Sequence, residues 1–96
     1  MSTPVDIGTL ITRSPELRNN RPRIAGTGVS VRTVVGWYKL GFNPEEIASE
    51  MNLDFSQVYA ALTYYHANRE EIEEDIAAEA AAADEIERQH YAKRRS

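Results

Sequence analysis

Few side chains in this sequence have the types and spacing that metal binding or acid–base catalysis requires. His66 and Glu70 are four residues apart and would share one face of a helix, but two ligands do not make a metal site. The segment Glu87–His90 has the Glu-x-x-His spacing of carboxylate-bridged di-iron bundles. Those bundles need the motif twice, together with further glutamates, and here it occurs once. We therefore expect no metal, no cofactor and no enzymatic activity.

Two further motifs have simpler structural explanations than chemical ones. Gly26-Thr27-Gly28 lacks the third glycine of a phosphate-binding loop and leads into a β-prone run instead of a helix. The acidic cluster between Glu70 and Asp75 suggests a metal-dependent nuclease at first sight, but consecutive acids point to different sides of a helix. A solvated helix start, with acids favoured by the helix dipole, explains the cluster better.

Composition limits the class of protein. With 96 residues the chain is one domain with a marginal core, so we expect a homodimer or a partner chain to add stability. The absence of cysteine excludes disulfides and thiolate metal sites and fits a reducing cytoplasm. Met1–Leu10 does not have the basic and apolar regions of a signal peptide, and no stretch is apolar enough for a membrane span. We expect a cytoplasmic protein without membrane contact.

The net charge of −4 conceals a division between the two parts of the chain. Residues 1–43 contain six basic and two acidic residues, a balance of +4, whereas residues 44–96 contain five basic and thirteen acidic ones, a balance of −8. This asymmetry predicts two surfaces that bind different partners.

Three apolar-periodic segments between residues 31 and 67 predict a compact unit of three helices with a helix-turn-helix at its centre. Gly41 and Asn52 are stop signals, because both residues adopt the left-handed conformation that ends a helix. Asn43 with Glu46, and Asp54 with Gln57, have capping-box spacing at the starts of the second and third helices. The residues expected to be buried include Val31, Val34, Val35, Tyr38, Ile47, Ala48, Met51, Phe55, Val58, Leu62 and Tyr65.

Before these helices, short β-prone runs predict an arm. Leu10-Ile11-Thr12 is one such run, and Arg23-Ile24-Ala25 and Val29-Ser30-Val31 are two more, joined by Gly26-Thr27-Gly28. We expect a small hairpin or extended arm that covers the helical core. The fold class is therefore mainly α, and residues 1–67 form the arm and the core together.

Residues 68–96 predict one long helix, from Arg69 to about Lys93, without proline or glycine. Asn68 and Glu71 have capping-box spacing, and Asp84 and Arg88 form an i,i+4 pair. Two interpretations have equal weight: a solvated helix lying partly on its own core, or a docking element for a second chain. The partner-binding candidates on its thin apolar stripe are Ile72, Ile76, Ile86 and Tyr91.

The third helix of this core would be the recognition helix if the protein binds DNA. Gln57 has the amide that pairs with adenine, but it also completes the capping box, and one side chain cannot easily do both. The second and third helices contain no lysine or arginine, so phosphate contacts would have to come from the N-terminal half. The nucleic-acid-binding candidates are Arg21, Arg23, Arg32, Ser56, Gln57, Ala60, Thr63 and Tyr64.

An ordered series of short motifs resembles the bacterial Domain of Unknown Function 433 family over roughly residues 5 to 76. The motifs are Asn20-Arg21-Pro22, Ile24-Ala25-Gly26-Thr27, Val29-Ser30-Val31, Gly36-Trp37-Tyr38, Gly41-Phe42-Asn43-Pro44-Glu45-Glu46-Ile47 and the segment from Val58 to Tyr65. The resemblance implies a homeodomain-like helical fold and an antitoxin whose partner is a small PIN-like toxin. The chain departs from the family pattern at Asn20-Arg21, where glycine and lysine are usual, and at Gly28, where arginine is frequent.

These observations lead to one functional expectation and one alternative. The expectation is an antitoxin-like, dimeric regulatory protein that binds its own operator DNA through the helical core and docks on a PIN-like toxin through the acidic helix. The alternative is a helical dimerisation or protein-interaction module that does not bind DNA.

Overall fold

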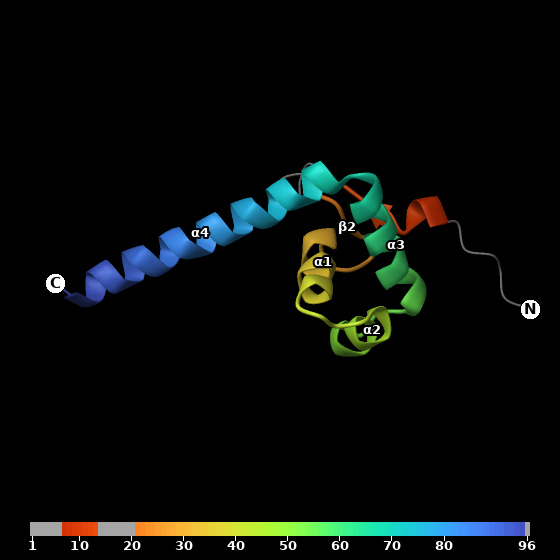
Figure 1. Ribbon diagram of the computed structural model, residues 1–96, viewed down its shortest axis with the longest axis horizontal. Coiled ribbons are helices and arrows are strands. Elements are labelled where there is room, and N and C mark those ends of the chain that lie inside the picture. The colour runs from red at the N-terminus through yellow and green to blue at the C-terminus, as the bar shows by residue number, and fades with distance from the viewer. Residues whose placement is uncertain (1–6, 14–20, 96) are drawn as a thin grey trace, which may run out of the picture.

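The computed structural model describes residues 7–13 and 21–95, and the side chains of residues 8–13 and 21–90. Three helices pack together into a small core: α1 (Val31–Lys39), α2 (Pro44–Met51) and α3 (Phe55–Ala67). A fourth helix, α4 (Arg69–Arg95), starts on this core and then runs away from it (Figure 1). The predicted mainly helical fold, with a short two-stranded element near its start and a long C-terminal helix, is confirmed.

The signals that define the helix boundaries are local hydrogen bonds. At the start of α2, the Asn43 side chain accepts from Glu46 N at 2.8 Å, and the Glu46 carboxylate accepts from Asn43 N at 3.0 Å. Asn52 ends α2 in the left-handed conformation, at φ 56°. Gly41 follows the end of α1 at φ +103°, a conformation that a side chain would strain. The predicted stops and the first capping box are confirmed.

The N-terminal strands pair differently from the expected hairpin. After a short 3₁₀ turn (Ile7–Thr9), strand β1 (Ile11–Thr12) pairs antiparallel with β2 (Arg23–Ile24), so that Ile11 lies opposite Ile24. The expected partner segment contributes a single bridge between Arg23 and Ser30. Ser30 leaves the arm early because it caps α1, with its side chain accepting from Thr33 N. Of the predicted hairpin, one bridge is therefore present.

The core lies where the strand β2 and the three short helices meet the first turns of α4. α1 and α3 form the main helix pair, α2 closes one end, and Ile72 of α4 is fully buried among them. The other buried apolar residues are Ile24, Val31, Val34, Val35, Ile47, Ala48, Val58, Ala61, Leu62 and Tyr65. Among the described helices, none combines the length and apolar composition needed to cross a bilayer.

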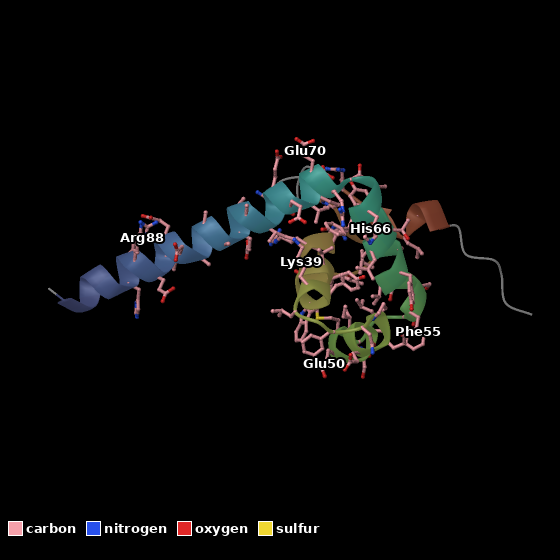
Figure 2. All side chains as sticks on the ribbon, in the orientation of Figure 1. Lys39, Glu50, Phe55, His66, Glu70 and Arg88 are labelled. Atoms are coloured by element: carbon pink, nitrogen blue, oxygen red, sulfur yellow. The ribbon has the colours of Figure 1, made fainter. Side chains whose placement is uncertain are left out.

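Two residues that the periodicity placed in the core lie on the surface. Phe55 is 56% exposed, because it is the first residue of α3 and lies at the outer end of that helix (Figure 2). Tyr38, near the end of α1, is also exposed. Trp37 beside it is half-buried and packs against the edge of Phe42, with ring centroids 4.7 Å apart. The apolar period therefore failed at the first residue of α3 and next to the last residue of α1, whereas Val31, the first residue of α1, is buried as predicted.

Candidate interaction surfaces

The first turns of α4 are joined to the rest of the protein by ion pairs, which we call the charged seam. Its acidic side consists of residues from α4 alone, and its basic side comes from the arm and from α1. The pairs are Arg13 with Glu71, Arg21 with Asp75, Arg32 with Asp75 and Glu79, and Lys39 with Glu73. The opposite charges of the two parts of the sequence therefore meet within one molecule.

Asp75 is the most deeply buried member of the seam, with 5% of its surface exposed. Its Oδ1 contacts both Arg21 and Arg32, and the distance to Arg32 Nη1 is 3.5 Å. Its Oδ2 is buried and has no hydrogen-bond partner among the described residues. Arg32 also reaches Glu79, at 3.4 Å, one turn further along α4. Two guanidinium groups thus balance a carboxylate that water barely reaches.

Two tyrosines of α3 extend the seam on its α3 side. Tyr64 Oη donates to Glu71 at 2.8 Å, and Tyr65 Oη donates to Glu73 at 2.5 Å. The hydrogen bond from Arg13 holds the pKa of Glu71 below its usual 4.5, and the bond from Lys39 does the same for Glu73. The hydrogen bond to Glu73 raises the pKa of Lys39 in turn. Each member of these pairs is held in its charged form.

Glu71 therefore does not form the capping box that its spacing from Asn68 suggested. Both of its carboxylate oxygens are bound by Tyr64 and Arg13. Asn68 instead ends α3, and its side-chain amide donates to the backbone carbonyl of Tyr64 at 3.1 Å. The prediction was wrong because a charged partner distant in sequence outcompeted a backbone amide three residues away.

The candidate DNA contacts on α3 differ in how much surface they present. Ser56 and Thr63 are exposed, whereas Ala60 is 8% exposed and lies in the chain's own interior, not on the free face expected for it. Gln57 accepts a hydrogen bond from Asp54 N at 2.8 Å, so its side chain is used for helix capping. Tyr64 is half-buried and bonded to Glu71. Two of the five α3 candidates thus present an open polar surface.

The three candidate arginines are all occupied within the chain. Arg21 and Arg32 contact Asp75, and Arg23 donates from Nη1 to the Thr27 carbonyl at 3.1 Å. None of the three lies on α3, and the side chains of Arg21 and Arg32 face the first turns of α4. The structure brings Arg21 and Arg32 together with α4 and not with the exposed first turn of α3.

The four partner-binding candidates on α4 lie in different environments. Ile72 is fully buried in the chain's own core, so it is not available to a partner, and Ile76 packs against the edge of that core. Ile86 is 67% exposed. Tyr91 belongs to the last turns of α4, and its side chain lies outside the described residues. The apolar stripe therefore changes from core to surface between residues 76 and 86.

Where α4 leaves the core, it forms an open corner with α1. This corner contains a groove with a volume of about 460 Å³. One side consists of α1 residues, including Trp37 and Leu40, the latter 77% exposed. The other side consists of α4 residues, among them Ile76, Ala80 and Ala83. We call this groove the α1–α4 corner.

We call the segment from Ala77 to Arg95 the projecting segment. It first lines the corner, at Glu79, Ala80 and Ala83, and then stands clear of the core (Figure 1). Every described side chain in it, from Ala77 to His90, is exposed. Figure 2 places Arg88 far from the core; it pairs with Glu85 at 3.2 Å instead of the expected Asp84. The radius of gyration, 15.7 Å, exceeds the roughly 12.5 Å typical of a compact domain of this length.

The described part of the chain has no group of three or more His, Asp or Glu side chains that could hold a metal ion. His66 on α3 and His90 on α4 are both exposed. Three surfaces of the described residues are therefore candidates for interaction with a partner: the charged seam, the α1–α4 corner and the projecting segment.

The comparisons with known proteins agree with this architecture. The model of a family described as protein of unknown function (DUF433) matches residues 11–65. A crystal structure of a DUF433 member protein from Anabaena variabilis has 28% sequence identity and a TM-score of 0.67, covering 72% of this chain and 69% of that one. No curated protein matches. The match covers more than half of the chain, which therefore belongs to the DUF433 family.

The charged seam and the α1–α4 corner are the features that sequence reasoning missed. The signal for the seam was present in the division of charge, a positive first part and a negative second part. That division predicted two separate outward-facing surfaces, but opposite charges in one small chain also attract each other. The corner had no signal, because its two sides are about forty residues apart in the sequence.

Proposed function

We propose that this protein is a regulatory binding protein of the antitoxin kind, whose docking element is the projecting segment of α4. The observation that carries this proposal is the exposure of every described side chain from Ala77 to His90. A helix in a globular protein is normally stabilised by burying one face, and here the described side chains of about half of α4, from Ala77 to His90, are all exposed. A partner protein would supply the missing contact.

The charges that face outward support a basic partner surface. Glu71, Glu73 and Asp75 are used inside the chain by the seam. The acids of α4 that lie outside the seam and face solvent are Glu70, which is on the outer side of α4 in Figure 2, and Glu74, Asp84, Glu85 and Glu87. Family resemblance implies a PIN-like toxin as the partner. In this mechanism the exposed carboxylates cover the basic cleft in which such a nuclease would bind the nucleic-acid backbone.

The experiment is a nuclease-inhibition assay with the product of the gene adjacent to this one. The variant should end after Ile76 and not at residue 68, because Ile72 belongs to the core and Asp75 to the seam. We expect the full chain to inhibit and the shortened chain to bind at least about tenfold more weakly. Circular dichroism on the shortened chain shows whether the core is intact, and full inhibition by a folded shortened chain would disprove the proposal.

Operator DNA is the second candidate ligand, and the observation that favours it is the position of α3. This helix follows α2 after a three-residue turn, and its first turn is open to solvent at Ser56. Affinity for phosphates would come from Arg21, Arg23 and Arg32, of which two are held by Asp75. Binding to DNA therefore requires that the seam share or release its arginines. Without that release, the alternative of an interaction module that does not bind DNA applies.

A salt titration of binding to the chain's own upstream DNA tests this second role. For a DNA-binding autoregulator, the affinity falls steeply with salt and falls again in the triple variant Arg21→Ala, Arg23→Ala, Arg32→Ala. The matched control is Arg88→Ala, which removes one cation from the projecting segment. Absence of saturable binding at low salt would leave the helix-turn-helix as a scaffold.

A further inference from the structure

The projecting segment has the length and pattern of a helix that pairs with its own copy. It runs from residue 77 to residue 95, so Ile86 is its midpoint, and Ile86 is the large apolar residue that is exposed among its described side chains, from Ala77 to His90. Ile76, Glu79, Ala83, Ile86 and His90 follow one another at spacings of three and four residues. This is the spacing along which two helices pack side by side.

The α1–α4 corner fixes where such a pair must end. α4 leaves the core at Ile76, and Trp37 and Leu40 of α1 form the wall beside it. A second helix lying antiparallel along the projecting segment can run only until its end meets this wall. Full overlap of the two projecting segments therefore places residue 86 of one copy beside residue 86 of the other. The end of each helix, which carries Lys93, Arg94 and Arg95, then lies at the corner of the other copy, beside Glu79.

The charges agree with this antiparallel register. With the two copies of Ile86 opposite each other, Glu79 of one copy lies at the level of Lys93 of the other, and both residues continue the spacing of Ile86 along the helix. The carboxylate of Glu79 is exposed at the corner. The two helix dipoles also oppose each other in this arrangement, whereas a parallel pair would align them. The Glu79–Lys93 pairing and the length of the segment thus fit the same register.

We propose that two copies of this protein associate through an antiparallel pair of α4 helices centred on Ile86, with the end of each helix seated in the α1–α4 corner of the other copy. This inference rests on the proposed function, in which the projecting segment is a docking element. It names a second copy of the chain as the binding partner of that segment when no other protein is bound. The helix pair is formed by the face of α4 that continues from Ile72, so the opposite face, around Ala81, stays open to solvent.

The first test is the molar mass of the full chain by sedimentation equilibrium over a range of concentrations. We expect a monomer–dimer equilibrium whose dissociation constant rises by about tenfold or more in Ile86→Glu, which places a charge at the centre of the pair. The matched control is Ala81→Glu, which adds the same charge on the opposite side of α4 and leaves the constant within about threefold of the wild type. A monomeric wild type at every concentration would overturn the inference.

The second test determines orientation and uses the absence of natural cysteine. Under mild oxidation, Ile86→Cys should form a disulfide-linked dimer rapidly, because the two copies of residue 86 are neighbours in the antiparallel pair. His90→Cys should not, because the two copies of residue 90 are eight residues apart in register. Equal cross-linking at both positions would indicate a parallel pair and contradict the proposed arrangement.

The outcomes separate this inference from the antitoxin proposal. A monomeric chain that still inhibits the adjacent gene product, and loses inhibition when cut after Ile76, would disprove self-association and leave the antitoxin role intact. A dimer that is lost in Ile86→Glu, together with inhibition that survives the cut, would do the reverse.

Discussion

Lys39 donates to both carboxylate oxygens of Glu73, at 2.5 and 2.7 Å, and so joins the last residue of α1 to the second turn of α4. Tyr65 of α3 donates to the same carboxylate. Three helices therefore meet at one acidic side chain. The group lies one turn before Ile76, the last residue of α4 that packs against the core.

Acidic pH should weaken the attachment of α4 to the core, whereas neutral pH should leave it intact. The folded-state pKa values of Glu71 and Glu73 lie below the usual 4.5 because of Arg13 and Lys39. Their contribution to the free energy of unfolding is therefore complete above pH 4.5 and is lost as the pH falls through the lowered values. Urea unfolding monitored by circular dichroism between pH 3 and pH 7 measures this loss.

The Glu73→Gln variant should lose less stability over the same acidic range, because it has one fewer carboxylate to protonate. Glu50→Gln on α2 is the matched control, since Figure 2 shows Glu50 on the outer side of the core, away from α4. An acid-induced loss of equal size in the wild type and in Glu73→Gln would contradict the role given to the Lys39–Glu73 pair.

Neutralising Asp75 should destabilise the protein and at the same time free two arginines. We expect Asp75→Asn to lower the free energy of unfolding by about 1–3 kcal/mol, less than a fully buried pair because Arg21 and Arg32 are partly exposed. If the chain binds DNA, the variant should bind more tightly at low salt. Chemical unfolding and the DNA titration measure the two effects, with Glu74→Gln as the neighbouring exposed control. Unchanged stability in Asp75→Asn would show that the seam is a weak surface feature.

Substitution by alanine should have effects of very different size at two isoleucines of α4. Ile72→Ala removes a fully buried side chain from the core and should cost about 2–5 kcal/mol of unfolding free energy. Ile86→Ala removes an exposed side chain and should change the stability of the monomer by less than about 0.5 kcal/mol. Denaturant unfolding at low protein concentration checks both, and similar losses in the two variants would mean that the stripe is buried along its whole length.

The part of α4 beyond the corner should be dispensable for folding. A chain that ends after Ile76 keeps Ile72, Asp75 and the Lys39–Glu73 contact and loses the exposed Glu79 that pairs with Arg32. Because an exposed ion pair contributes little, its core should unfold with a denaturant midpoint close to that of the full chain. A chain that ends after Asn68 loses all of them and should be much less stable. Unfolding of the longer variant in the absence of denaturant would show that the projecting segment stabilises the core.

The helices of this protein were predictable because their signals are local. Asn43 with Glu46, and the left-handed Asn52, act within one turn of the chain, and both appear as predicted. The strand pairing was less predictable, since β2 had a near neighbour at residues 29–31 and a more distant one at Ile11, and the longer ladder formed with the distant one. Sequence signals that act over a few residues do not decide which of these two segments pairs with β2.

The candidate surfaces were harder to predict because charges act over distance. Arg32 and Asp75 are 43 residues apart, and their contact depends on how α4 crosses α1. The sequence predicted arginines turned toward DNA and acids turned toward a toxin, whereas the fold directs several of each toward one another. Exposure of the acids and of Ile86 beyond the corner was consistent with the docking-helix interpretation, which remains a prediction.

The length of the projecting segment has a consequence for any assembly built on it. Nineteen helical residues span about 28 Å, and the sequence of this segment contains no glycine or proline at which it could bend. In an antiparallel pair, each copy would hold its partner's core at the far end of this rod. The segment would then act as a ruler that sets the spacing between two cores, and removing one heptad would bring them closer by about 10 Å.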